Sequence, residues 1–225
     1  MEKRIVLIHG WGARAGKLEA LSLKLEALGW EVLNLDMPGF GLADPPTAWG
    51  VGEYGDWVLG QIDKKWKRGT YAIFGHSFGG RVAIKLAALG KVDKVVLCAP
   101  GGLSRSGVVK RLIFKGLASL GKKMGLEQQK GFLYKLAREH DYEKTSGIMR
   151  EVFKKVINED LNPLAKGIKV PTLVLWGKQD RMVPYTDGQK FVQAKLVLFD
   201  NQGHRVPYEL PEEVAKEINI WFGSL

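Results

Sequence analysis

The chain alternates between short, nearly continuous apolar runs and segments whose apolar residues recur at helical spacing. The apolar runs that we interpret as strands are 5–8, 32–35, 71–74, 95–98, 172–176 and 196–199. The segments that we interpret as helices are 16–28, 52–67, 79–90, 186–193 and 211–222. Continuous apolar runs are typical of strands covered on both faces. The alternation therefore predicts an α/β domain in which helices flank a mainly parallel sheet of about six strands.

Residues 103–168 interrupt this alternation, because they contain no convincing strand. They hold three apolar stripes at helical spacing, namely Val109, Leu112, Ile113, Leu117 and Leu120, then Phe132, Leu133, Leu136 and Ala137, then Ile148, Met149, Val152, Phe153 and Val156. A glycine pair before the segment and Pro171 after it mark plausible boundaries. We therefore expect a core domain made of 1–102 and 169–225, with a helical insertion at 103–168 between two strands of the sheet.

The composition is that of an ordinary globular protein: 225 residues, 45% apolar and 26% charged. Cys98 is the single cysteine, which excludes an internal disulfide framework and zinc sites of the Cys₄ or Cys₂His₂ kind. No apolar stretch approaches the roughly 18 residues of a membrane-spanning helix. The apolar run near the N-terminus is too short for the hydrophobic region of a signal peptide. We expect a soluble, cytoplasmic protein without a metal or organic cofactor.

The net charge of +10 is regional. Residues 101–170 hold 15 Lys and Arg against 7 Asp and Glu, which accounts for most of the excess. The sequence has no zinc-finger spacing, no aromatic RNA-binding signature and no basic region leading into heptads, so we expect no nucleic-acid partner. A solvated lysine-rich face is the favoured interpretation. Attraction of an anionic substrate, or of a membrane surface through the basic run 108–124, is the alternative. The sequence does not predict an oligomeric state.

A candidate nucleophile lies in the segment Gly75-His76-Ser77-Phe78-Gly79-Gly80, between an expected strand and an expected helix. This is the pattern G-x-S-x-G in its strand–turn–helix context. The serine needs a strained turn, and the residues two before and two after it must be small so that the backbone can pass. The helix that follows would direct its N-terminal N–H groups toward a developing oxyanion. The alternative is a serine in an ordinary glycine-rich turn.

A serine needs a general base, and the chain has four histidines. His9 ends the first strand and His76 adjoins the serine, so we expect both to serve backbone geometry. His140 lies in the insertion, where a surface role is favoured. His204 follows the last strand, on the face where the sites of open α/β sheets collect. We assign it as general base and then general acid.

The base in turn needs a carboxylate to hold its tautomer. Asp180 comes just beyond the strand 172–176 and is the favoured acid. Asp200 and Asp36 are rivals, because each follows an expected strand; Asp200 is only four residues from His204, where it would help to shape the loop.

Acyl transfer also requires two N–H donors for the oxyanion. One is expected from Phe78, the residue after the serine, and the other from Trp11 in the segment His9-Gly10-Trp11-Gly12. A tight strand-to-helix turn is a second interpretation of that segment, and both can hold together. Phe40, Phe78 and Met182 are candidates for the lining of a substrate pocket.

Taken together, these motifs closely resemble the α/β-hydrolase superfamily and, within it, the small serine carboxylesterases. The resemblance rests on HGWG at 9–12, DMPGFG at 36–41, GHSFGG at 75–80, WGKQD at 176–180 and the Gly203-His204 pair. It implies an acyl-enzyme mechanism and a helical cap at 103–168. Because the chain starts at the strand that members usually reach third, we expect the usual N-terminal hairpin to be lacking. Ser77 also argues against the dehalogenase and epoxide hydrolase branches, which use an aspartate nucleophile.

The order Ser77, Asp180, His204 is that of an α/β-hydrolase triad. We therefore expect cleavage of a small-molecule carboxylic ester. The same triad also serves lactones, thioesters and carbon–carbon bonds next to a ketone, and some relatives are receptors that keep the triad without turnover. Neither the substrate nor the choice among these reactions is contained in the triad itself.

Overall fold

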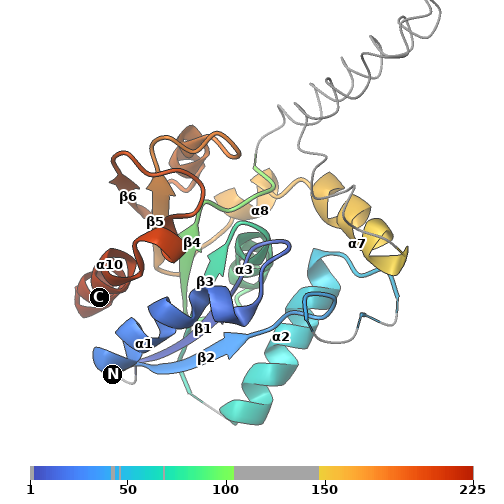
Figure 1. Ribbon diagram of the computed structural model, residues 1–225, viewed down its shortest axis with the longest axis horizontal. Coiled ribbons are helices and arrows are strands. Elements are labelled where there is room, and N and C mark those ends of the chain that lie inside the picture. Colours follow the sequence, from blue (N-terminus) through green and yellow to red (C-terminus); the bar gives the residue numbers. More distant parts are fainter. Residues whose placement is uncertain (1–2, 42–43, 46, 68, 104–146, 225) are drawn as a thin grey trace, which may run out of the picture.

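The computed structural model describes residues 3–41, 44–45, 47–67, 69–103 and 147–224 (Figure 1). The strands are β1 (Arg4–Ile8), β2 (Glu31–Leu35), β3 (Ala72–His76), β4 (Lys94–Cys98), β5 (Thr172–Gly177) and β6 (Lys195–Phe199). The helices are α1 (Glu19–Ala27), α2 (Val51–Lys65), α3 (Phe78–Ala88), α7 (Gly147–Asn158), α8 (Asn162–Lys166), α9 (Val206–Glu209) and α10 (Pro211–Gly223), with 3₁₀ turns η1 (Ala15–Leu18) and η3 (Tyr185–Lys190). The predicted alternation of strands and helices is confirmed.

The six strands form one sheet in the order β2-β1-β3-β4-β5-β6, and every pair of neighbours is parallel. The chain adds β2 on one side of β1 and then builds outward from β3 on the other. In the register of β1 and β3, Ile8 lies opposite Gly75. Parallel strands all end at the same edge of the sheet, and ligands of open α/β sheets bind where the strand order reverses. The loops after β1 and β3 therefore meet at the expected place for a site.

Helices cover both faces of the sheet (Figure 1). The alternating side chains of β1 divide between two apolar clusters, with Val6 and Ile8 in one and Ile5 and Leu7 in the other. The first cluster includes side chains of α2, α3, α7 and α8, and the second includes those of α1 and α10. Each strand in the middle of the sheet is thus buried on both sides, which explains its nearly continuous apolar sequence.

The edge strands depart from the prediction that all six are covered on both faces. β2 and β6 are only partly buried, with one buried residue in β2 and none in β6. An edge strand has one neighbour and fewer helices against it, yet its sequence can be as apolar as that of an inner strand. The prediction of an α-helix at 186–193 is also wrong, because this segment forms the 3₁₀ turn η3, which ends at Lys190. The short helix α9 was not predicted.

Part of the predicted insertion is described. The third predicted stripe is confirmed as α7, whose Met149, Val152 and Val156 are buried. The stripes at 109–120 and 132–137, and with them His140, lie outside the described residues. The division into core and cap domains stays a prediction.

Cationic side chains of α3 hold the end of α7. Arg81 donates from Nη1 to the backbone carbonyls of Val156 at 2.7 Å and Glu159 at 3.3 Å. Lys85 pairs with the Glu159 carboxylate at 2.7 Å. The carbonyls at the C-terminal end of a helix carry partial negative charge, so cations are favourable there. α7 is thereby attached to the helix that begins directly after Ser77.

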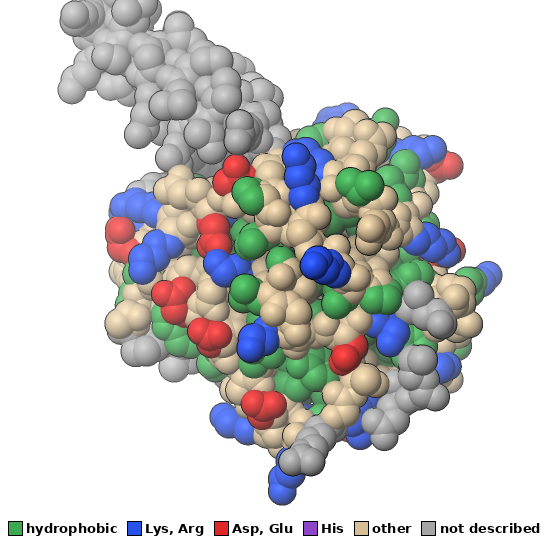
Figure 2. Space-filling model, turned by 180° about the vertical axis from the view of Figure 1, so that it is seen from behind, with side chains coloured by type: hydrophobic (Ala, Val, Ile, Leu, Met, Phe, Trp, Pro, Cys, Tyr) green, Lys and Arg blue, Asp and Glu red, His purple; other side chains and the backbone are tan. Residues whose placement is uncertain are grey.

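Within the ranges given above, no helix has both the length and the apolar character to span a bilayer. On the face of the molecule in Figure 2, lysine and arginine side chains are interspersed with acidic ones.

Candidate active site

Ser77 stands between the end of β3 and the start of α3 in a backbone conformation that side chains rarely adopt. Its φ is 52° and its ψ is −102°. Hydrogen bonds hold it there from both sides: its N–H donates to the carbonyl of Cys98 at 3.0 Å, and its carbonyl accepts from the N–H of Gly101 at 3.0 Å. A strained residue persists only where the surroundings over-determine it, and such residues concentrate at functional sites.

The glycines beside Ser77 are required by close backbone packing. A Cβ atom on Gly75 would lie 2.4 Å from the carbonyl oxygen of Gly79. One on Gly79 would lie 2.3 Å from the carbonyl oxygen of Ile8, at the end of β1. Any larger residue at either position would force the turn apart. The sharp turn that the G-x-S-x-G pattern predicts is present.

Asp180 and His204 form a buried pair. Nδ1 of His204 lies 2.7 Å from Oδ2 of Asp180, and the exposed fractions of the two side chains are 9% and 0%. The other carboxylate oxygen accepts from the backbone N–H groups of Met182 at 2.7 Å and Val183 at 2.8 Å. The indole N–H of Trp176 donates to Oδ2 at 3.2 Å.

These contacts determine the protonation of the pair. Burial by itself raises the pKa of Asp180, but the hydrogen bond and charge of His204 and the two backbone donors outweigh it, so the pKa is lowered. The carboxylate is therefore ionised, and its Oδ2 accepts a hydrogen bond from the Nδ1–H group of His204. The neutral imidazole then has its lone pair on Nε2, which is the form a general base requires.

The two rival carboxylates have other partners. Asp200 is 73% exposed and pairs with Lys178 at 2.6 Å. Asp36 accepts the backbone N–H of Ala15 at 2.6 Å, which ties the end of β2 to the turn after β1. Of the three candidates, Asp180 is the one that the fold brings to His204.

Ser77 and His204 lie on neighbouring loops. Nε2 of His76, the residue before Ser77, is 2.8 Å from the backbone carbonyl oxygen of His204, and the two imidazole rings are 5.0 Å apart. Among the hydrogen bonds of the described residues, none joins the Ser77 hydroxyl to the His204 ring. Catalytic hydrogen bonds are often long in the free enzyme and tighten with substrate.

The other two described histidines hold backbone. Nε2 of His9 accepts the N–H of Met37 at 3.1 Å, and its Nδ1 lies 2.8 Å from the carbonyl oxygen of Gly10. Burial lowers the pKa of His9, and it lowers the pKa of His76 to about 3. Both rings therefore stay neutral at physiological pH, in agreement with the geometric role expected of them.

The two expected oxyanion donors lie at the ends of adjacent strands, Trp11 after β1 and Phe78 after β3. Among the described residues, neither backbone N–H has a hydrogen-bond acceptor. Backbone N–H groups without a partner next to a strained serine are what an oxyanion site requires.

Aromatic rings pack around these donors. The Trp11 ring lies 4.8 Å from Phe40, 5.5 Å from Phe78 and 4.9 Å from Phe153, measured between ring centroids. All three contacts are edge-to-face, which is a favourable arrangement for aromatic pairs. Phe153 comes from α7, so this helix contributes to the surroundings of Trp11.

The sequence profile of the alpha/beta hydrolase family matches residues 5–217. The chain belongs to that family. A pimeloyl-[acyl-carrier protein] methyl ester esterase of Neisseria meningitidis is 29% identical over 90% of this chain and 86% of its own length. A 2-hydroxy-6-oxo-6-phenylhexa-2,4-dienoate hydrolase of Comamonas testosteroni is 26% identical over 93% of this chain and 84% of its own. The crystal structure of the enol-lactonase from Burkholderia xenovorans LB400 superposes with a TM-score of 0.71 at 22% identity, covering 99% of this chain and 92% of that one.

The three predicted pocket residues of this alpha/beta hydrolase have different surroundings. Phe78 is buried. Phe40 is buried against Trp11 and Phe78. Met182 is 47% exposed and lines a hollow of about 290 Å³ together with His204. Phe40 thus lies among the rings around Trp11, whereas Met182 lies at the rim of the hollow beside His204.

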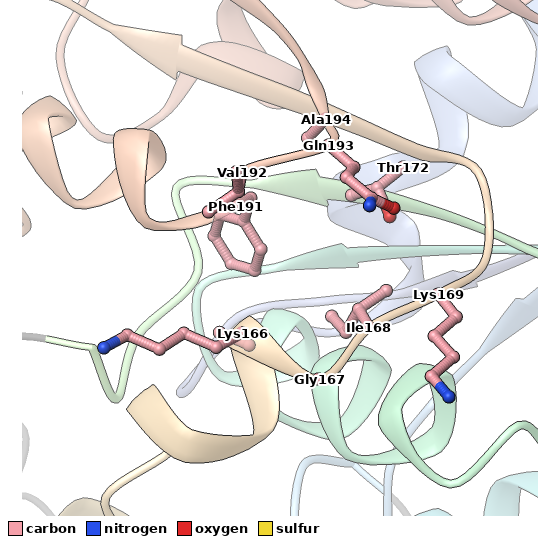
Figure 3. Close-up of a pocket in the computed structure, with 10 residues that line it drawn as sticks. Lys166, Gly167, Ile168, Lys169, Thr172, Phe191, Val192, Gln193 and Ala194 are labelled. Carbon is pink, nitrogen blue, oxygen red and sulfur yellow. The ribbon is translucent and has the colours of Figure 1, made fainter.

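A second cavity of about 390 Å³ lies away from these residues, between α8 and the segment before β6 (Figure 3). Phe191 and Ile168 line the cavity, and the side chains of Lys166 and Lys169 extend away from its border. It contains none of the predicted site residues of this alpha/beta hydrolase.

Sequence reasoning missed two residues of the site. Phe153 was assigned to an apolar stripe, and a stripe does not say which of its members meets another element. Tyr208 follows His204 by four residues and bonds to His76. No recognised motif includes it, although a tyrosine just past the predicted base was a signal that the sequence contained.

Proposed function

We propose that this alpha/beta hydrolase is a serine esterase that cleaves carboxylic esters through Ser77, His204 and Asp180. The observation that carries the proposal is the strained Ser77 at the end of β3, together with the 2.7 Å contact between Asp180, on the loop after β5, and His204, on the loop after β6. The nucleophile, the base and the residue that orients the base then stand in the order a serine hydrolase needs.

In the proposed first step, Nε2 of His204 takes the proton of the Ser77 hydroxyl as the serine oxygen attacks the ester carbonyl. The carbonyl oxygen becomes an oxyanion and accepts from the N–H groups of Trp11 and Phe78. As this tetrahedral intermediate collapses, the protonated His204 gives its proton to the leaving alkoxide. An alcohol departs and the acyl group stays on Ser77.

In the second step, water replaces the alcohol. His204 removes a proton from the water as it attacks the acyl carbon, and then returns that proton to the serine oxygen. Asp180 stays ionised throughout and stabilises the imidazolium that forms twice in each cycle. The products are a carboxylic acid and the free enzyme, and the scheme requires no metal or organic cofactor.

The aromatic rings around the expected oxyanion donors favour a substrate with an apolar acyl group. Trp11, Phe40, Phe78 and Phe153 present rings rather than charges next to the expected oxyanion donors. The esterase of Neisseria meningitidis, at 29% identity, supports ester cleavage as the first choice.

Carbon–carbon bond hydrolysis is the second candidate, favoured by the relative from Comamonas testosteroni whose name describes a dienoate hydrolase. It would use the same base and oxyanion donors, and it would cleave next to a ketone in place of an ester. Turnover of a 2-hydroxy-6-oxo-dienoate in the absence of turnover of any ester would favour it.

The test is hydrolysis of p-nitrophenyl esters from acetate to palmitate by the wild type and by Ser77→Ala. We expect the variant to lose at least about 10³-fold in kcat while it stays folded, because removal of a triad member leaves the oxyanion donors alone. The preferred chain length measures the acyl pocket. Wild-type turnover by Ser77→Ala would overturn the proposal. If the folded wild type turned over no ester, lactones and thioesters would be tried next, and tight binding without turnover would indicate a receptor.

A further inference from the structure

Tyr208 connects three parts of the site that the triad does not link. It lies in the short helix α9, which begins at Val206, two residues after His204. Its hydroxyl is 2.9 Å from Nδ1 of His76 and 3.3 Å from the backbone nitrogen of Gly10. On the far side of the same imidazole, Nε2 of His76 is 2.8 Å from the carbonyl oxygen of His204. The series runs from the loop after β1, through the serine turn, to the loop after β6.

The protons in this series can be assigned from its two ends. A backbone carbonyl only accepts, so Nε2 of His76 must carry the proton that it donates to His204. Nδ1 of the neutral ring is then an acceptor, and the Tyr208 hydroxyl must donate to it. A backbone N–H only donates, so the Tyr208 oxygen accepts from Gly10. Each of the three contacts then has one donor and one acceptor, and no arrangement with the protons reversed satisfies both ends.

Burial preserves this arrangement over the working pH range. It lowers the pKa of His76 to about 3 and raises the pKa of Tyr208 to about 12, so both groups remain neutral. The packing is also close. The rings of Tyr208 and His76 are 4.8 Å apart in an edge-to-face contact, and a Cβ on Gly10 would lie 2.9 Å from Nδ1 of His76.

We propose that Tyr208 is a positioning residue that holds the loop of Trp11 and the loop of His204 in register through His76. Gly10 directly precedes Trp11, the expected oxyanion donor, and the carbonyl of His204 belongs to the base itself. The inference rests on the proposed esterase function. Tyr208 touches no reacting atom in this scheme. It sets the separation between the group that stabilises the oxyanion and the group that moves the proton.

The test is Tyr208→Phe, which removes only the hydroxyl. We expect kcat to fall about tenfold, with KM changed by less than about twofold, because small displacements of catalytic groups cost rate more than they cost ground-state binding. The loss should be larger for an ethyl ester than for the p-nitrophenyl ester of the same acid. Ethoxide leaves only if His204 protonates it, whereas p-nitrophenolate is stable without a proton. Active sites are counted with a fluorophosphonate, so that unfolded protein does not enter kcat.

Tyr71→Phe is the matched control. The Tyr71 hydroxyl likewise makes one donor hydrogen bond, in this case to the backbone carbonyl of Lys91 at 3.0 Å, on a part of the surface away from the site. This variant should keep the wild-type kcat and the wild-type ratio between the two esters. If Tyr208→Phe lowers thermal stability but matches Tyr71→Phe in both quantities, the hydroxyl is merely structural and the inference is overturned.

An NMR measurement separates failure of this inference from failure of the esterase proposal. ¹⁵N spectra of the wild type should show His76 as the Nε2–H tautomer, and Tyr208→Phe should shift its Nδ1 resonance and the amide resonance of Trp11. These shifts do not depend on any substrate. Their absence would overturn the positioning role even in an active esterase. Their presence in a protein that hydrolyses no ester would leave the connection standing and reject the esterase.

Discussion

Two groups of side chains surround Ser77, and they are held together by different interactions. We call the hydrogen-bonded group the polar side and the group of packed rings the aromatic side. On one side, His204, Asp180, His76 and Tyr208 are joined by hydrogen bonds of 2.7 to 2.9 Å that involve ring nitrogens, a carboxylate, a hydroxyl and a carbonyl. On the other side, Trp11, Phe40, Phe78 and Phe153 meet through ring contacts of 4.8 to 5.5 Å.

The difference predicts how each side responds to substitution. A hydrogen bond fails when one partner is removed, and a buried polar group left without a partner is costly. Ring packing is less specific in direction, and neighbours of similar volume can replace one another at modest cost. Changes on the polar side should therefore reduce the rate itself, whereas changes on the aromatic side should alter which substrates fit.

The largest effect is expected for Asp180→Asn. The amide no longer favours the Nδ1–H tautomer of His204 and cannot stabilise the imidazolium, so kcat should fall by about 10³- to 10⁴-fold. KM should change little, because Asp180 is buried behind His204 and is expected to touch no substrate. The measurement is steady-state hydrolysis of the preferred p-nitrophenyl ester.

Asp200→Asn is the control for this prediction. Asp200 follows a strand as Asp180 does, but it is largely exposed and pairs with Lys178. An exposed pair of this kind contributes little, so the variant should stay within about twofold of the wild type. An equal loss in both variants would show that the acid had been assigned to the wrong loop.

The next effect is a dependence of stability on pH that originates in His76. Its pKa is about 3 in the folded protein and 6.5 ordinarily, so between these values the unfolded chain binds the proton and the folded one does not. The free energy of unfolding should therefore fall as the pH is lowered from 6.5 toward 4. One such group contributes a slope of up to about 1.4 kcal/mol per pH unit. Denaturant unfolding at a series of pH values measures it.

His76→Gln should flatten this slope, since glutamine does not titrate, while His9 continues to contribute in both proteins because burial lowers its pKa as well. Asp180 acts in a separate window. Its pKa is lowered, so its contribution is complete above the ordinary value of 3.8 and is lost as the pH falls further. Identical slopes for the wild type and His76→Gln between pH 6.5 and 4 would contradict the buried neutral imidazole.

The polar side was largely predictable from the sequence because its residues stand at fixed places in the fold. Parallel strands end at one edge, so Ser77, Asp180 and His204 could be expected to meet once each was seen to follow a strand. The choice of Asp180 over Asp200 relied on motif order, and the geometry of the pair agrees with it. The hydrogen bonds of His76 were harder to predict, because no feature of the sequence shows which partners a histidine beside the serine will have.

The contacts between distant elements were not predictable. Tyr208 reaches His76 across 132 positions, and Phe153 reaches Trp11 from a helix whose apolar stripe contains several equivalent residues. Which member of a stripe touches which neighbour depends on how the helix is rotated and docked. Here that docking involves Arg81 and the carbonyls at the end of α7, a long-range contact that periodicity cannot express.

The smallest effect, and the one that tests the aromatic side, is expected for Phe153→Ala. Phe153 is half-buried against Trp11, so its removal leaves space beside the expected oxyanion donors without touching any hydrogen bond of the triad. Longer acyl chains should gain in kcat/KM relative to acetate by about tenfold. This gain is within the range expected in an apolar pocket, where a methylene contributes about 1–3 kcal/mol. The turnover of p-nitrophenyl acetate itself should change by less than about threefold.

Phe199→Ala, which removes a half-buried phenyl ring on the opposite face of the sheet, is the control and should leave the chain-length profile unchanged. If both variants gave the wild-type profile, the acyl group would have to bind elsewhere than against the rings around Trp11. If Phe153→Ala instead lowered kcat equally for every ester, the two sides of Ser77 would not be separable, and the ring contacts would belong to the same positioning apparatus as the hydrogen bonds.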